Sequence, residues 1–175
     1  MLFVKSLLVL AATVNAGLLG FGKTNPSDVD VKTLDQDVLG MISALQSYNG
    51  GGLAKTAPIK AAVAKYGTDV NLVTEHLKAD AGINLDVTAD LVGLLTSTFI
   101  PDLKQFFSLL EAKKAIFVAD GLVSQVKAGL ERIKSETDTL SQTLLSKVPK
   151  VKIPQVKNVL NDYNASISAA IALWA

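Results

Sequence analysis

The spacing of apolar residues along the chain predicts helices over almost all of its length. From residue 28 onward, apolar side chains recur every three or four positions, so they fall on one face of a helix. No segment has a convincing strand pattern. The pattern predicts six helices, over residues 28–48, 58–82, 86–95, 101–117, 122–148 and 154–174. The expected fold is all-α, an antiparallel bundle of five to six amphipathic helices.

Glycine and proline mark the ends of these helices. The run 49–52, Asn-Gly-Gly-Gly, stops the first helix, and Pro58 suits the first turn of the second. Pro101 predicts a break or kink between the third and fourth helices. Pro149 and Pro154 bracket a short linker before the last one. These helices form one expected domain over residues 27–175.

The first 16 residues have the pattern of a secretory signal peptide. One cation, Lys5, precedes the apolar run 7–12, and Val14 and Ala16 stand at the minus-three and minus-one positions of a cleavage site. A buried first strand or helix is the alternative, but it gives no reason for small residues at these positions. No later uncharged window is long enough to span a bilayer. We therefore expect residues 1–16 to be removed and the protein to be secreted, without a transmembrane segment.

The next residues match a nucleotide-binding pattern that the context argues against. Residues 17–24 satisfy G-x-x-x-x-G-K-[ST], the loop that binds phosphate between a buried strand and the start of a helix. Here no strand is predicted before the loop, and Asn25 and Pro26 follow at once. We therefore interpret residues 17–26 as a flexible, glycine-rich N-terminus of the mature protein.

Composition and charge narrow the function classes. The chain is 49% apolar, which excludes a disordered protein, and its 17 basic against 16 acidic residues give no electrostatic reason to expect a nucleic acid partner. There is no cysteine and one histidine, His76, so thiol catalysis and a zinc site of Cys and His ligands are excluded. No nucleophile and base stand in a recognisable pattern. The sequence predicts no catalytic residue, no metal and no cofactor, and a protein that is not an enzyme.

The order of these features resembles a fungal family. An acidic first helix, a glycine-broken turn and a proline-split pair of helices precede the stretch 109–117, Leu-Leu-Glu-Ala-Lys-Lys-Ala-Ile-Phe, and then a long helix with Leu130, Leu140 and Leu144. Over residues 27–174 the chain resembles the hydrophobic surface binding protein A family, also called the cell wall galactomannoprotein family. The resemblance implies an all-helical, extracellular or cell-wall-associated domain that binds hydrophobic surfaces or long-chain lipids, such as fatty acids, within its bundle.

The residues themselves are compatible with a lipid-binding interior. Only 6% of them are aromatic and the helices are lined by aliphatic side chains, so a slot between helices could take an acyl chain. The candidate ligand-binding residues lie on two of the predicted helices: Lys113, Phe106, Leu110, Phe117, Leu130 and Ile133. The alternative is a cell-wall or surface protein with a dry, packed core, whose outer face contacts a partner such as cell-wall polysaccharide.

Two polar positions carry expectations of their own. At 100° per residue, Lys113 falls among the apolar side chains of its helix, where its stem covers apolar surface or its ammonium meets a fatty-acid carboxylate. Ser108 or Tyr48 would then be further hydrogen-bond donors. Asn164 begins the usable glycosylation sequon, Asn-Ala-Ser, but it lies at the edge of an apolar helix face. We expect low or absent occupancy there.

Overall fold

The fold is taken from a computed structural model, which describes residues 26–175. The predicted signal peptide, residues 1–16, lies outside the described residues, as does the phosphate-loop pattern at 17–24. Of the predicted flexible N-terminus, residues 17–26, only Pro26 is described.

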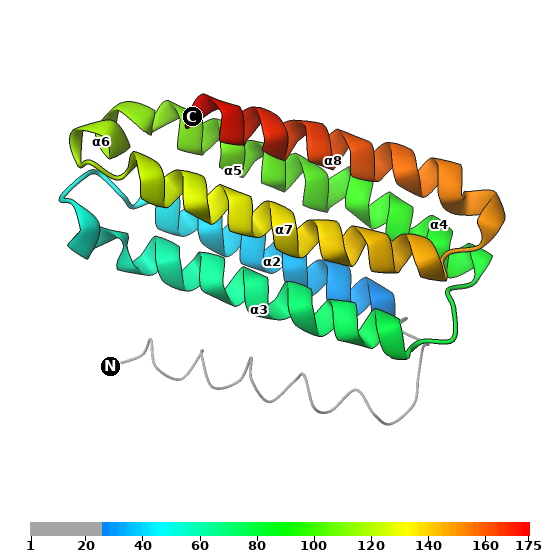
Figure 1. The fold of residues 1–175 in the computed structure, drawn as a ribbon. Coiled ribbons are helices and arrows are strands. Elements are labelled where there is room, and N and C mark those ends of the chain that lie inside the picture. Colours follow the sequence, from blue (N-terminus) through cyan, green and yellow to red (C-terminus); the bar gives the residue numbers. More distant parts are fainter. Residues whose placement is uncertain (1–25) are drawn as a thin grey trace, which may run out of the picture.

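Helices account for nearly all of the described chain, and residues 26–175 contain no strand. They are α2 (Pro26–Gln46), α3 (Ala57–Ala79), α4 (Leu85–Leu94), α5 (Ile100–Ala112), α6 (Lys114–Ala119), α7 (Val123–Lys147) and α8 (Ile153–Leu173), with the short helical turns η1 (Leu53–Thr56), η2 (Leu95–Phe99) and η3 (Lys150–Lys152). Figure 1 shows the long helices side by side, with α4 and α5 in line as one rod and the chain reversing direction at each end. The predicted all-α antiparallel bundle is confirmed.

The predicted apolar stripes form the core of this bundle. On α2, the stripe residues Val31, Leu34, Val38, Met41 and Leu45 are all buried. They meet stripes from the other long helices in a single hydrophobic cluster. Each helix is amphipathic and cannot bury its apolar face alone, so packing against the others stabilises all of them together.

The chain passes Pro101 without leaving the helical path. Five residues before it, Leu95–Phe99, form one π-helical turn, in which the N–H of Ile100 donates to the carbonyl of Leu95. A proline has no N–H, and its ring would collide with a carbonyl of the preceding turn in a regular α-helix. The wider turn accommodates Pro101, so α4 and α5 continue one another where a break or kink was expected.

The fourth predicted helix, over 101–117, is wrong in one respect, because it is interrupted at Lys113. This residue has φ −93° and ψ 4°, and it separates α5 from the short helix α6. The helical rotation of 100° per residue therefore cannot be extended from α5 past Lys113. Lys113 is not part of the apolar arc that contains Phe106 and Leu110.

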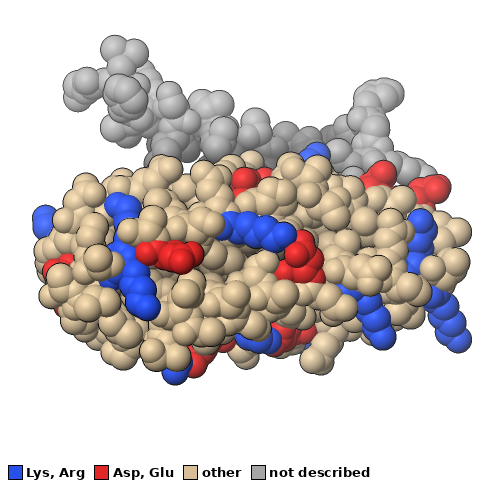
Figure 2. Space-filling view, turned by 90° about the horizontal axis from the view of Figure 1, so that it is seen from above, with Lys and Arg blue, Asp and Glu red and all other residues tan. Residues whose placement is uncertain are grey.

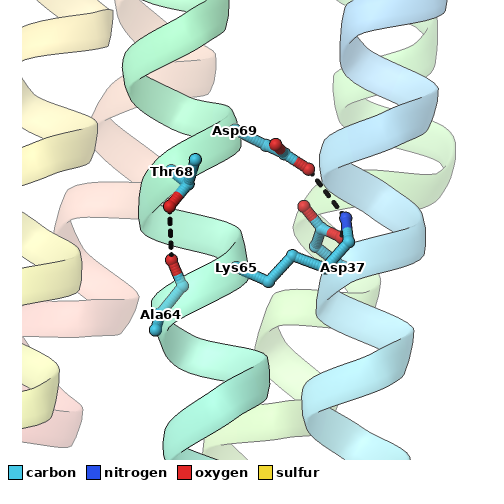
Figure 3. Close-up of polar contacts among 5 residues, drawn as sticks. All are labelled: Asp37, Ala64, Lys65, Thr68 and Asp69. Carbon is cyan, nitrogen blue, oxygen red and sulfur yellow. Dashed lines mark hydrogen bonds and ion pairs between the residues drawn. The ribbon is translucent and has the colours of Figure 1, made fainter.

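A buried carboxylate joins α2 to α3. The side chain of Asp37 is only 3% exposed, and Lys65 on α3 donates to it while also donating to Asp69 at 2.7 Å (Figure 3). Burial raises the pKa of Asp37 despite the ammonium beside it. Burial acts in the same direction on Asp69, but the hydrogen bond from Lys65 and its positive charge outweigh this and lower the pKa of Asp69. Lys65 thus offsets the cost of burying the Asp37 carboxylate between α2 and α3.

Replacing Lys65 with methionine should lower the free energy of unfolding by about 2 kcal/mol at neutral pH, because Asp37 stays buried without a cation. The loss should shrink as the pH falls, since protonation of Asp37 removes its charge. Urea unfolding at neutral and acidic pH measures both effects. The matched control is Lys78→Met, which breaks an exposed pair with Glu75 and should cost well under 1 kcal/mol. Equal urea midpoints for Lys65→Met and the wild type would contradict this account.

Candidate functional site

A cavity of about 480 Å³ opens between the N-terminal halves of α3 and α7. We call it the α3–α7 cavity. Ligand-binding pockets in proteins commonly measure about 300–1,000 Å³, so it is large enough for a small molecule. Its walls carry Ile59, Val63 and Ala64 from α3, and α5 and α6 add phenylalanine and leucine side chains. From α7 it is lined by Gln125, Val126, Ala128, Gly129, Leu130, Arg132 and Ile133. The bundle is therefore not closely packed at this level.

Small residues account for the space. Ala64 on α3 and Ala128 and Gly129 on α7 all line the cavity. At Gly129 an added Cβ atom would meet no other heavy atom within 4 Å. Glycine in the interior of a helix costs up to about 1 kcal/mol relative to alanine, so this position gives up helix stability and leaves the cavity open.

Five of the six side chains predicted to contact a ligand line this one cavity. They come from three helices: Phe106, Leu110, Phe117, Leu130 and Ile133. All are 4% exposed or less, so they form the inner wall of the α3–α7 cavity. The structure brings them together, and their contact with a ligand stays a prediction.

An aromatic cluster closes the end of the bundle beside this cavity. The ring of Phe117 stacks on Tyr48 with centroids 4.7 Å apart and meets the edge of Trp174 at 5.8 Å. The hydroxyl of Tyr48 donates to Asp120. Burial, and then this bond, raise the pKa of Tyr48 to about 12, while the same bond lowers the pKa of Asp120. Tyr48 is thereby fixed in place as the support of Phe117.

Lys113 lies outside the α3–α7 cavity. Its Nζ donates to the carbonyl of Gln46 at 3.0 Å, to the carbonyl of Tyr48, and to Oδ1 of Asn49 at 3.4 Å. Gln46 is the last residue of α2, so the ammonium satisfies carbonyl groups that a helix end leaves free. Tyr48 does come close to Lys113, as the sequence allowed, but through its carbonyl and not through its hydroxyl.

Polar side chains stand around the cavity, and sequence reasoning did not identify them. Lys60, Gln125 and Arg132 all line it and are exposed. Arg132 already donates to Glu136 at 2.8 Å. Lys60 forms no ion pair with any residue in 26–175. Only Lys60 had a clue in the sequence, because it directly follows Ile59, a residue of the apolar stripe of its helix.

Other candidate chemistry is sparse in the part of the chain that the structure describes. Within it, no three His, Cys, Asp or Glu side chains come together as a metal site. His76 is half-exposed, with Nδ1 3.2 Å from Asp30. Asn164 lies inside α8 with its Oδ1 buried, which supports the prediction of low glycosylation. None of these groups forms a nucleophile–base pair.

The charges on the face of the molecule shown in Figure 2 add no second candidate. In Figure 2, basic and acidic side chains are interspersed over the face shown, without a continuous patch of one sign. None of the helices in residues 26–175 combines the length and the apolar character that crossing a membrane requires. The α3–α7 cavity is therefore the site with the clearest capacity to bind a ligand.

Comparison with known proteins gives one family and several similar folds. The sequence model of the hydrophobic surface binding protein A family matches residues 29–146. No curated protein matches the chain. AfMP4p, solved in complex with palmitic acid, superposes with a TM-score of 0.79 at 22% identity, over 84% of this chain and 96% of that one.

Two domains of one other protein have similar folds. Ligand binding domain 1 of Penicillium marneffei MP1, complexed with arachidonic acids, has a TM-score of 0.78 at 20% identity, over 85% of this chain and 95% of that one. Ligand binding domain 2 of the same protein, also with arachidonic acids, has a TM-score of 0.77 at 16% identity, over 90% and 98%. At these identities the likeness establishes the fold.

Proposed function

We propose that this chain, which belongs to the hydrophobic surface binding protein A family, is a secreted, non-enzymatic protein that binds long-chain fatty acids in the α3–α7 cavity. The observation that carries the proposal is the cavity of about 480 Å³ with a predominantly apolar wall. An acyl chain gains about 0.8 kcal/mol for each methylene that it buries in such a space. The fatty acids bound by AfMP4p and MP1 support the same ligand class.

The polar rim suggests how the acid is oriented. Its carboxylate would lie at the mouth, near Lys60 and Arg132, and its chain would extend inward along Phe106, Leu110 and Phe117. Lys60 is the better partner of the two, because Arg132 is already paired with Glu136. The ammonium of Lys113 is occupied by three acceptors at the end of α2, so we do not assign it to the ligand.

Location outside the cell, free or associated with the cell wall, is part of the proposal. The signal-peptide pattern of residues 1–16 and the family support it. Cell-wall polysaccharide remains a candidate partner for the outer face of the bundle. N-terminal sequencing of protein secreted by its own cells tests the location, and a chain that still begins at Met1 would contradict it.

Binding of palmitic acid and of its methyl ester tests both the function and the orientation. We expect native mass spectrometry to detect a complex of the wild type with palmitic acid and titration calorimetry to give its affinity. Lys60→Met should weaken binding of the acid by about two- to fivefold, because an exposed ion pair is worth at most about 1 kcal/mol, and should leave the ester unaffected. Lys113→Met is the matched control and should bind the acid like the wild type.

Each outcome of this test has a definite meaning. A wild-type protein that takes up neither compound overturns the proposed function. Weaker binding of the acid by Lys113→Met, with normal binding by Lys60→Met, overturns the orientation. The carboxylate would then lie at Lys113, as the sequence predicted.

A further inference from the structure

An acidic residue next to the α3–α7 cavity controls one of the two cations at its mouth. Arg132 lines the cavity and is exposed, so a ligand headgroup at the mouth can reach its guanidinium. Glu136 lies one helical turn further along α7 and does not line the cavity. Nε of Arg132 donates to Oε1 of Glu136 at 2.8 Å. Glu136 can therefore act on a ligand through Arg132.

A glycine on α3 provides the space for the Glu136 carboxylate. The helices α3 and α7 pack against each other, and a Cβ atom added at Gly67 would lie 2.4 Å from Oε2 of Glu136 and 2.9 Å from Oε1. Any larger residue at position 67 would displace the carboxylate, because these distances are far shorter than a van der Waals contact. Gly67 lies in the interior of α3, where glycine is less stable than alanine. The carboxylate is thus confined between the two helices.

This confinement distinguishes Glu136 from the other paired acids of α7. Glu131 and Asp138 also form ion pairs within the helix, but their side chains are 54% and 34% exposed, so water screens both pairs. The side chain of Glu136 is 15% exposed, and its Oε2 is buried without a hydrogen-bond partner among residues 26–175. Its pairing with Arg132 is therefore less screened, and Arg132 is the cation that compensates for its charge.

The pair changes what Arg132 can contribute to binding. A free guanidinium attracts a carboxylate with its full positive charge, whereas a guanidinium paired with an acid presents the much weaker field of a neutral pair. Lys60 and Arg132 are both positive, and Glu136 cancels one of these charges. A carboxylate headgroup loses attraction as a result. An uncharged headgroup loses little, because it gains little from a free cation.

We propose that Glu136, acting through Arg132, sets the headgroup selectivity of the α3–α7 cavity. It keeps the preference for a carboxylate small, so that the cavity accepts uncharged lipids such as fatty-acid esters as well as fatty acids. This inference rests on the proposed function, since it concerns the same cavity. Glu136 is a positioning residue, and glutamine in its place would remove the charge while keeping Oε1 as the acceptor for Nε of Arg132.

Titration calorimetry of the full-length protein with palmitic acid and with its methyl ester tests the proposal. For Glu136→Gln we expect the affinity for the acid to rise about two- to fivefold, the value of an exposed ion pair, and the affinity for the ester to stay unchanged. The gain should shrink at about 1 M salt, which screens the freed charge of Arg132. Glu131→Gln is the matched control, because it removes a paired acid of α7 that does not contact the cavity, and it should change neither affinity.

A double variant shows whether the gain depends on Arg132. In Arg132→Met/Glu136→Gln the affinity for the acid should return to about the wild-type value, because the freed cation is gone. A gain that persists in this double variant, or that extends equally to the ester, would overturn the inference.

The remaining outcomes separate this inference from the proposed function. A wild-type protein that binds neither compound overturns both. A wild-type protein that binds the acid but not the ester overturns this inference alone. The same holds if Glu136→Gln, shown to be folded by urea unfolding, binds the acid no more tightly than the wild type.

Discussion

Replacing Gly129 with phenylalanine should weaken binding of palmitic acid by about fiftyfold. Position 129 lines the α3–α7 cavity, and a Cβ atom there meets nothing within 4 Å, so the new ring extends into the space that the acyl chain needs. Displacing about three methylenes from the cavity costs roughly 2.4 kcal/mol at ~0.8 kcal/mol each, which is about fiftyfold in affinity. Titration calorimetry with palmitic acid measures this loss.

Stability separates a filled cavity from a damaged fold. Phenylalanine is a better helix former than glycine, so Gly129→Phe should unfold at the same urea concentration as the wild type or a higher one. The matched control is Gly40→Phe, at an exposed glycine of α2 where an added Cβ also meets nothing within 4 Å; it should bind palmitic acid normally. Unchanged affinity in a folded Gly129→Phe protein would show that the acid binds elsewhere.

Replacing Phe117 with alanine should lower the free energy of unfolding by about 3–5 kcal/mol, the usual cost of removing a buried phenylalanine ring. This ring is 2% exposed, stacks on Tyr48 and meets Trp174, so its loss removes both aromatic contacts and one side chain of the cavity wall. Urea unfolding followed by the fluorescence of Trp174 reports on this end of the bundle directly.

The neighbouring residue provides the control. Val118 is 51% exposed, and Val118→Ala should change the free energy of unfolding by less than about 0.5 kcal/mol. A loss below about 1 kcal/mol for Phe117→Ala would mean that the aromatic cluster contributes little to the stability of this end. The account of how Tyr48 supports the cavity would then be wrong.

The burial of the five cavity-lining residues could be predicted from periodicity and from the family resemblance, whereas the position of Lys113 could not. Phe106 and Leu110 fall on the apolar stripe of a single helix, so their burial follows from spacing alone. Lys113 was placed by extending the same spacing past the point where α5 ends. Its real partners, Gln46 and Tyr48, are more than 60 residues away in the chain, and no local pattern connects them.

The cavity inside the bundle could not be predicted from the sequence for the same reason. The sequence identified Leu130 and Ile133 as buried, but an open space needs small residues on two helices to face one gap, as Ala64 and Gly129 do. Lys60 becomes a candidate for the carboxylate only because α3 and α7 stand apart at that level.

The sequence by itself determined the helices, their buried faces and the family, because these follow from the spacing of side chains along one backbone. The tertiary structure alone decided where the core stays open and which cation stands at the cavity. Those properties depend on distances between helices that are far apart in the chain. Such distances are set by how all the side chains pack together, and no single stretch of sequence contains them.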